Sequence, residues 1–96
     1  MSYSLKFLPS ALKEWNKLGA TVRNQFKKKL EERLLEPEVP ADRLRGQQNY
    51  YKIKLRGSGY RLVYEVEKAE ITIYVIAVGK RENESVYRIA DKRKRK

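Results

Sequence analysis

Hydrophobic residues recur along this chain at spacings that predict both strands and helices. Alternation of Tyr3, Leu5 and Phe7 with polar residues predicts a short N-terminal strand. The segment that follows begins at Pro9, a residue that suits the first turn of a helix, and ends at Gly19. Its apolar positions recur at helical spacing and predict one buried stripe: Leu12, Trp15 and Leu18.

A second helix is predicted between Thr21, which suits an N-cap, and Pro37, which ends the helical pattern. Apolar residues recur every fourth position along it: Val22, Phe26, Leu30 and Leu34. The run Lys27-Lys28-Lys29 falls on the other side and is expected to face outward. We therefore expect a helical hairpin with one apolar seam, followed by a loop at residues 36–42.

The second half of the chain has the pattern of strands. Residues 51–56 alternate strictly between apolar and polar side chains, and 57–59 (Gly-Ser-Gly) form a turn. In residues 60–66 the apolar set Tyr60, Leu62, Tyr64 and Val66 alternates with Arg61, Val63 and Glu65. Residues 71–78 are apolar at nearly every position, which is typical of a central strand covered on both faces. A short helix is expected at about residues 83–92, with three apolar positions: Val86, Ile89 and Ala90.

The predicted fold is therefore α+β in one domain, residues 1–96. An N-terminal strand and a helical hairpin pack on a small, mostly antiparallel sheet, and a short C-terminal helix follows. The length of 96 residues suits one small domain with one modest core.

The hairpin of strands 51–56 and 60–66 also predicts where its charged side chains lie. Residue numbers opposed across a turn have a constant sum, and burying the apolar residues of both strands requires that sum to be odd. The same register gathers cations on the other face: Lys52, Lys54, Arg56 and Arg61. An odd sum needs a connection of two or four residues, or a bulge, and the glycines at 57 and 59 permit any of these.

The charge balance favours a polyanionic partner. The chain has 23 Lys and Arg against 12 Asp and Glu, a net charge of +11. The excess is uneven, because residues 43–61 contain six basic residues and no acidic one. The apolar stretch Ile71–Val78 is too short to span a membrane, and the N-terminus lacks the apolar core of a signal peptide, so we expect a cytoplasmic protein.

The absence of Cys and His narrows the chemistry. It excludes disulfides, cysteine-based zinc sites, nucleophile–histidine pairs and RNA cleavage by paired histidines. The candidates for proton transfer and charge stabilisation are then lysine, arginine, tyrosine and carboxylates. A lysine has an ordinary pKa near 10.4, which neighbouring cations lower, and an arginine can stabilise developing charge. Such a site is a weak catalyst on its own and gains from a substrate held in place by something larger.

The basic strand face has a tyrosine within reach. Lys80 and Arg81 follow the last predicted strand, and Tyr87 lies about one turn into the last helix, so we expect them to approach the same face. Cations that hold phosphates beside an aromatic ring that stacks an unpaired base are typical of single-stranded RNA binding. The alternative is an exposed basic face with an incidental tyrosine.

Four segments carry a resemblance to a known family. ALKEWNKLG (11–19), LRG (44–46), YKIKLRGSGYRLVYEV (51–66) and VIAVGKRENESVY (75–87) closely resemble the RelE-type mRNA interferase toxins of the RelE/ParE toxin–antitoxin superfamily. The resemblance implies an endonuclease that cleaves mRNA in the A site of the 70S ribosome. It also implies cleavage by 2′-hydroxyl attack, which leaves a cyclic phosphate and uses no metal or other cofactor.

The resemblance also implies catalytic roles, residue by residue. Lys52 and Lys54 match the positions of the general base and of phosphate binding, and which of them is the base stays open. Arg61 matches the arginine that stabilises the transition state, and Arg81 the one beside the leaving 5′-oxygen. Tyr87 matches the tyrosine that stacks on the nucleotide.

Further basic residues are expected to contact RNA. Arg45 matches a basic residue implicated in activity, and Arg56 and Lys80 complete the basic set. The tail DKRKRK (91–96) is more basic than the family pattern. The C-terminal helix is therefore the part of the chain for which the resemblance is the weakest guide.

The family further implies a cognate RelB-like antitoxin. By analogy it covers the sheet–helix surface, displaces the last helix and represses the shared operon, so operator DNA is contacted only through the complex. No membrane partner is expected. Two other functions stay open from the sequence: a non-catalytic RNA- or ribosome-binding module, and a toxin of the same fold with another target such as gyrase.

Overall fold

The computed structural model describes residues 2–46, 49–80 and 85–93. Its elements follow in the order β1 (Ser4–Phe7), α1 (Pro9–Asn16), α2 (Ala20–Leu35), the short 3-10 helix η1 (Pro40–Asp42), β2 (Tyr50–Leu55), β3 (Tyr60–Glu67), β4 (Thr72–Lys80) and α3 (Ser85–Lys92). The strands form one sheet in the order β1-β4-β3-β2. β1 runs parallel to β4, and the other neighbours are antiparallel. The predicted α+β fold is confirmed.

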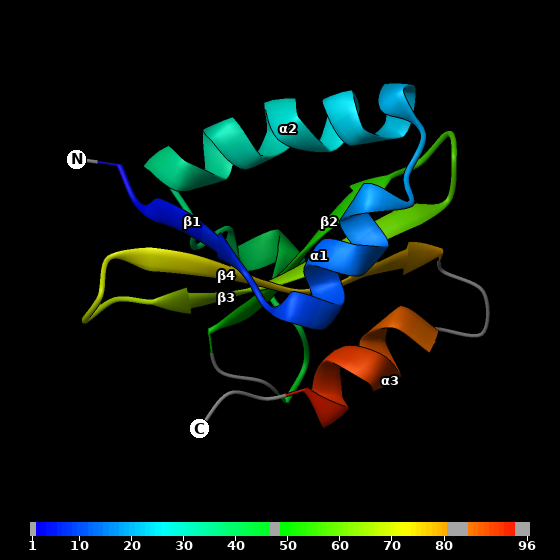
Figure 1. Ribbon diagram of the computed structural model, residues 1–96. Helices are drawn as coiled ribbons and strands as arrows, with labels where there is room; N and C mark the ends of the chain where they lie inside the picture. The colour runs from blue at the N-terminus through cyan, green and yellow to red at the C-terminus, as the bar shows by residue number, and fades with distance from the viewer. Residues whose placement is uncertain (1, 47–48, 81–84, 94–96) are drawn as a thin grey trace.

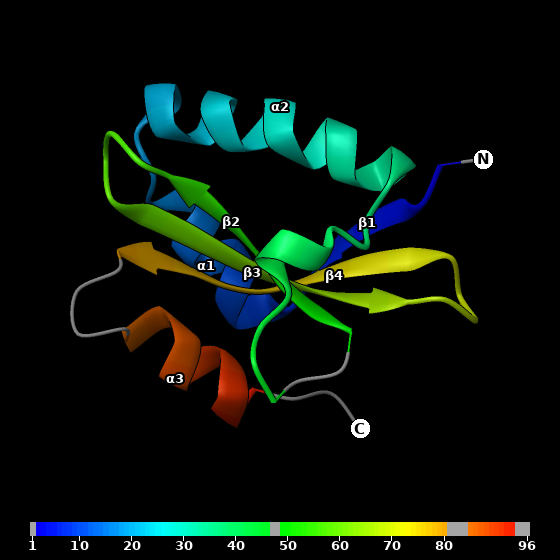
Figure 2. The ribbon, with the colours of Figure 1, turned by 180° about the vertical axis from the view of Figure 1, so that it is seen from behind.

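Helices cover both faces of the sheet (Figures 1 and 2). On one face α1 and α2 bury the larger apolar cluster. In it the centre of the Trp15 ring lies 5.2 Å from the centre of the Phe7 ring and 6.2 Å from the centre of the Phe26 ring. On the other face α3 contributes Val86 and Ala90 to a smaller cluster. β4 is a central strand covered on both sides, as its continuous apolar run predicts. Among the described residues, no helix is long and apolar enough to cross a membrane.

A β-bulge changes which residues of β4 face each cluster. Tyr64 pairs with Val75 and Val63 pairs with Ala77, so Ile76 is the extra residue. Ile76 and Ala77 both face α3, whereas the residues on either side of them face the helical hairpin. The bulge therefore reverses the alternation of side chains along the rest of β4.

Three details of the helices differ from the prediction. The N-cap of α2 is Gly19, and Thr21 lies inside the helix, because the extended backbone at Gly19 starts the helix earlier. On α1 the buried residues are Ala11 and Trp15, while Leu12 is 43% exposed. On α3, Ile89 is 36% exposed. Helical spacing identifies an apolar stripe, but packing against the sheet sets the rotation of each helix.

Candidate functional site

The register of the β2–β3 hairpin places the candidate catalytic cations together. Lys54 pairs with Arg61 and Lys52 pairs with Val63, so the opposed residue numbers have the odd sum that the sequence requires. Four residues connect the strands, from Arg56 to Gly59, and Gly59 has a φ of +77°, which glycine adopts without strain. Directly paired residues share a face, and Val63 belongs to the cluster under α3. Lys52, Lys54 and Arg61 therefore lie on the α3 side of the sheet.

Arg61 is the most buried of these cations, with 7% of its surface exposed. Its Nη1 donates to the Tyr60 carbonyl oxygen at 3.0 Å, while its buried Nε has no hydrogen-bond partner among the residues that the structure describes. A buried guanidinium donor without an acceptor is unfavourable, and an anion that accepts from it relieves the cost. This geometry suits a phosphate.

Within the described part of the chain no carboxylate forms an ion pair with Lys52, Lys54 or Arg61, and Glu65 is the carboxylate that β3 places on the same face. The three ion pairs there involve other basic residues, Arg33, Lys68 and Arg93. Lys52 and Lys54 are half-buried, and both keep part of their surface exposed. The face therefore combines partly desolvated positive charge with access from solvent, which strengthens its attraction for a phosphate backbone.

Helix α3 brings Tyr87 to the same face. Val86 and Ala90 anchor the helix on the sheet, and Tyr87 is half-buried against the cluster that contains Val63. Val63 is the direct partner of Lys52, so Tyr87 lies on the same face of the sheet as Lys52, Lys54 and Arg61. An aromatic ring beside cations suits an unpaired base with its phosphates.

Two further predicted residues lie at opposite ends of β2. Arg45 is exposed in the turn before the strand, next to Leu44, which packs against the cluster under α3. The Leu44 amide donates to the Tyr50 carbonyl oxygen at 2.9 Å and ties this turn to the strand. Arg56 is exposed in the β2–β3 connection and lies outside β2 itself. The basic set therefore follows the length of the β2 edge.

The expectation that Lys80 shares this face is wrong. Lys80 pairs with Tyr60, and its Nζ lies 5.6 Å from the centre of the Tyr60 ring, on the side of the helical hairpin. Simple alternation from Ile73 would place Lys80 on the α3 side, and the bulge at Ile76 reverses it. Arg81, the predicted partner of the leaving oxygen, lies outside the described residues.

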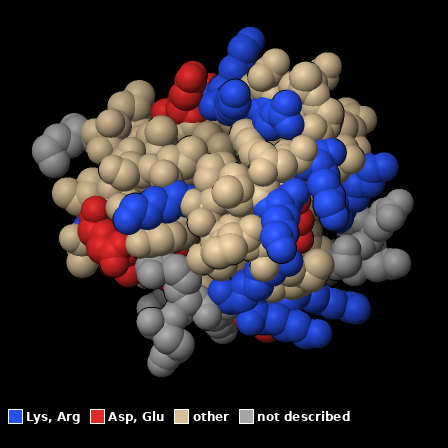
Figure 3. Space-filling view, in the orientation of Figure 1, with Lys and Arg blue, Asp and Glu red and all other residues tan. Residues whose placement is uncertain are grey.

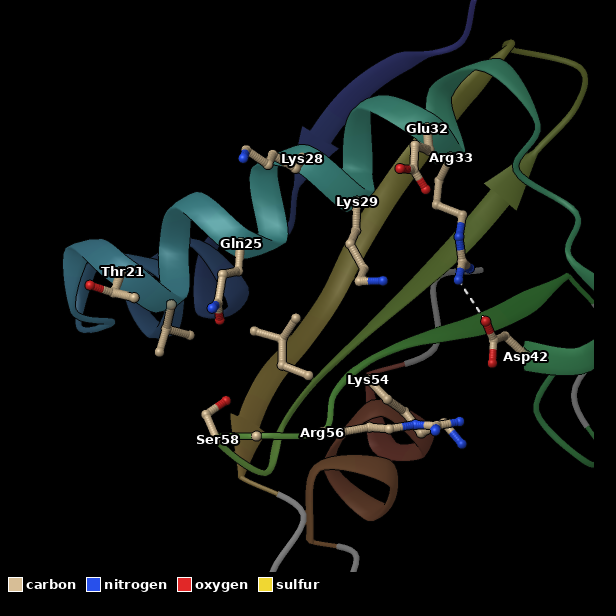
Figure 4. A pocket seen from close by; sticks show the side chains of 13 residues that line it. Thr21, Gln25, Lys28, Lys29, Glu32, Arg33, Asp42, Lys54, Arg56 and Ser58 are labelled. Atoms are coloured by element: carbon tan, nitrogen blue, oxygen red, sulfur yellow. Dashed lines mark hydrogen bonds and ion pairs between the residues drawn. The ribbon is translucent and has the colours of Figure 1, made fainter.

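The structure adds a basic groove that sequence reasoning missed. A cavity of about 870 Å³ opens between α2 and the β2–β3 connection. In Figure 4, Lys28 and Lys29 extend from α2, while Lys54 and Arg56 extend in one direction from the β2 edge. Two carboxylates are among the described residues that line the groove. They are Glu32 and Asp42, and Asp42 pairs with Arg33. The sequence feature that could have indicated this groove is the Lys27–Lys29 run, because its lysines were predicted to face outward.

Charge is also unevenly distributed over the face of the molecule that Figure 3 shows. In the view of Figure 3, Lys and Arg side chains gather on the side of α1 and α3. Acidic side chains gather at the end of the β3–β4 turn, the part of the chain that holds Glu67 and Glu70. An asymmetric charge distribution of this kind orients a protein as it approaches a polyanion.

A buried polar cluster supports β2 from behind. Arg33 on α2 donates from Nη1 to the Tyr64 hydroxyl at 2.8 Å and to the Lys52 carbonyl oxygen at 3.3 Å, and pairs through Nη2 with Asp42 at 2.6 Å. The Tyr64 hydroxyl donates to the Pro37 carbonyl oxygen at 2.6 Å. Burial raises the pKa of Tyr64 to about 12. The cluster joins α2, the following loop and β2 directly beneath Lys52.

Comparison with known proteins adds independent information. The family model described as "ParE toxin of type II toxin-antitoxin system, parDE" matches residues 5–84. The chain is 57% identical over 93 residues to the mRNA interferase toxin RelE of Escherichia coli strain K12, covering 97% of this chain and 98% of that protein.

Solved structures agree with this similarity. A free arginine-to-alanine variant of Escherichia coli toxin RelE shares 56% identity with a TM-score of 0.90, covering 97% of this chain and 98% of the other. The toxin chain of the intact Escherichia coli RelBE toxin–antitoxin complex shares 57% identity with a TM-score of 0.81, covering 82% and 96%.

Proposed function

This chain belongs to the RelE toxins of the RelE/ParE superfamily, and we propose that it is an mRNA interferase, an endoribonuclease that inhibits translation. We place its action at the A site of the 70S ribosome, in the cytoplasm, on the codon positioned there. The ribosome supplies the rigid hold on the substrate that a site without a strong acid–base pair needs.

In the proposed reaction the 2′-hydroxyl oxygen attacks the adjacent phosphorus while the bond to the leaving 5′-oxygen breaks. Lys52 or Lys54 accepts the proton of the hydroxyl, and the other lysine holds the phosphate. Arg61 donates hydrogen bonds to the charge that develops on the phosphate oxygens. Arg81, which the family resemblance assigns to the general-acid position, donates a proton to the leaving 5′-oxygen, and the products carry a 2′,3′-cyclic phosphate and a 5′-hydroxyl.

The remaining residues bind and orient the RNA. Tyr87 stacks on the nucleotide, and Arg45 and Arg56 contact phosphates at the two ends of the β2 edge. Lys80, on the other face of the sheet, contacts RNA outside the codon in this proposal. No step of the scheme uses a metal.

One observation carries the proposal most directly. Lys54 and Arg61 are paired across β2 and β3, no described carboxylate forms an ion pair with either, and α3 holds Tyr87 against the same face. Like charges that are directly opposed destabilise a sheet. A phosphate between them turns this unfavourable pair into a binding site.

We also propose a RelB-like antitoxin as the neutralising partner, because the Escherichia coli relative is known in a complex with one. A net charge of +11 requires a complementary partner to keep the toxin inactive. Contact with operator DNA would then occur only through that complex.

Primer extension on mRNA from cells that express the chain tests the function. Cleavage phased to codons supports it, whereas intact mRNA with arrested growth indicates a binding module without catalysis. A DNA-damage response indicates another target. Purified protein should barely cleave naked RNA, and efficient cleavage without ribosomes would contradict the proposed dependence.

A further inference from the structure

The end of α3 is tied to α1 by an ion pair between residues far apart in the sequence. Arg93 Nη2 lies 2.9 Å from Glu14 Oε2, and Arg93 Nη1 lies 3.0 Å from Glu14 Oε1. The two side chains are 23% and 26% exposed, so solvent screens the pair only in part. A guanidinium that meets both carboxylate oxygens has the fork geometry that makes such pairs strong and directional.

The same two side chains complete the edge of β4 where its neighbouring strand stops. β1 pairs with β4 only from Thr72 to Val75. Beyond that point the Val78 amide donates to Glu14 Oε1 at 3.0 Å, and Arg93 Nη1 donates to the Ile76 carbonyl oxygen at 3.0 Å. Glu14 and Arg93 thus take the place of backbone partners that β1 does not reach.

Helix α3 needs contacts with the rest of the fold to form. It has eight residues, well below the roughly 12–15 that an isolated helix needs in water. Its fully buried side chains are small, Val86 and Ala90. The Arg93 amide bonds the carbonyl oxygens of Ile89 and Ala90, both at 3.1 Å, so the position of Arg93 is linked directly to the helix.

We propose that Glu14 and Arg93 are positioning residues that hold α3 against the sheet and thereby hold Tyr87 over the basic face of β2 and β3. This inference rests on the proposed function, because the role of Tyr87 in orienting RNA belongs to it. The pair acts through the helix, since Glu14 lies on α1 and Arg93 follows the last residue of α3.

Hydrogen exchange tests the docking of α3 without reference to activity. The variants are Glu14→Gln, Arg93→Gln and their combination; glutamine at 14 keeps an acceptor for the Val78 amide. Arg88→Gln is the matched control, because Arg88 is exposed on the same helix and carries the same charge. Each single variant should speed exchange of the α3 amides about tenfold, and the double variant no more than either single one. The α2 amides serve as an internal reference for the intact fold.

Single-turnover cleavage on saturated, programmed ribosomes tests the link to Tyr87. Arg93→Gln should slow cleavage about tenfold in the wild-type background and not at all in a Tyr87→Ala background, whereas Arg88→Gln should leave the rate unchanged. Unchanged α3 exchange in both single variants would overturn the proposal, as would an equal reduction in rate in the Tyr87→Ala background. Should wild-type protein fail to cleave, the proposed function fails, and the exchange measurement still decides whether the pair docks the helix.

Discussion

Lys54 and Arg61 lie directly opposite each other on β2 and β3, on the face that α3 covers in part. Two like charges that face each other across neighbouring strands repel and destabilise the sheet. Most sheets avoid this repulsion by placing charges of opposite sign in such pairs. The fold retains the pair beside an edge where phosphate is proposed to bind. Stability and function are therefore expected to oppose each other at these two residues.

Replacement of Lys54 by Gln should reveal this opposition. Removing one of the two facing charges should raise the free energy of unfolding by about 0.2–1 kcal/mol. The same change should lower the rate of cleavage, because the charge is proposed to act on the phosphate or the 2′-hydroxyl. Urea unfolding of both proteins measures the first effect, and a loss of stability in the Gln variant would contradict it.

Arg61→Gln should impair the chemical step far more than binding. Loss of a preorganised donor to a developing charge costs about 2.7–4 kcal/mol, roughly a hundred- to a thousandfold in rate. Lys68→Gln is the control, since Lys68 carries the same charge in the exposed β3–β4 turn, where it pairs with Glu38. Single-turnover cleavage at saturation should separate the two variants. Near wild-type cleavage by the Arg61 variant would make the basic face a docking surface only.

The α2 side of the groove, with Lys28 and Lys29, should contribute affinity without contributing to chemistry. Lys28→Gln with Lys29→Gln should weaken ribosome binding and reduce its salt dependence, by about 0.7–0.9 in log–log slope for each phosphate that the variant no longer neutralises. Lys27→Gln is the matched control, because Lys27 is exposed on the same helix but does not line the groove. Binding titrations at several salt concentrations provide the measurement. Equal slopes for all these variants would show that the groove does not contact RNA.

The buried hydroxyl of Tyr64 should make stability fall in alkali. Burial raises the pKa of Tyr64 to about 12, from an ordinary value near 10. The folded state therefore holds this proton more tightly than the unfolded state, so the stabilisation is complete below about pH 10 and is lost as pH rises towards 12. Two pKa units correspond to on the order of 2–3 kcal/mol.

Comparison with Tyr64→Phe isolates this effect from the titration of the other tyrosines and the lysines. At neutral pH the variant should be less stable by about 1–3 kcal/mol, because Arg33 and the Pro37 carbonyl lose a buried partner. The difference in unfolding free energy between the two proteins should shrink from pH 9 to pH 12. A difference that is constant with pH would mean that Tyr64 ionises as easily in the folded protein as in the unfolded one.

Local patterns in the sequence were sufficient to predict the strands, the helices and the composition of the two faces of the hairpin. Side chains alternate with a period of two along a strand, so the burial of Ile53 and Leu62 decides on which side Lys54 and Arg61 lie. Periodicity and charge content therefore predicted the α+β fold and predicted that the hairpin cations lie on one face of the sheet. The family resemblance added the roles proposed for them.

Tertiary packing, in contrast, set how far Arg61 is buried, where Lys80 points and what holds α3 in place. The bulge at Ile76 reverses the face of Lys80, and a bulge depends on how two strands pair. The bond between Glu14 and Arg93 joins residues 79 positions apart. Local patterns contain no information about such contacts, because they form only when packing brings α1, the open edge of β4 and the end of α3 to one point.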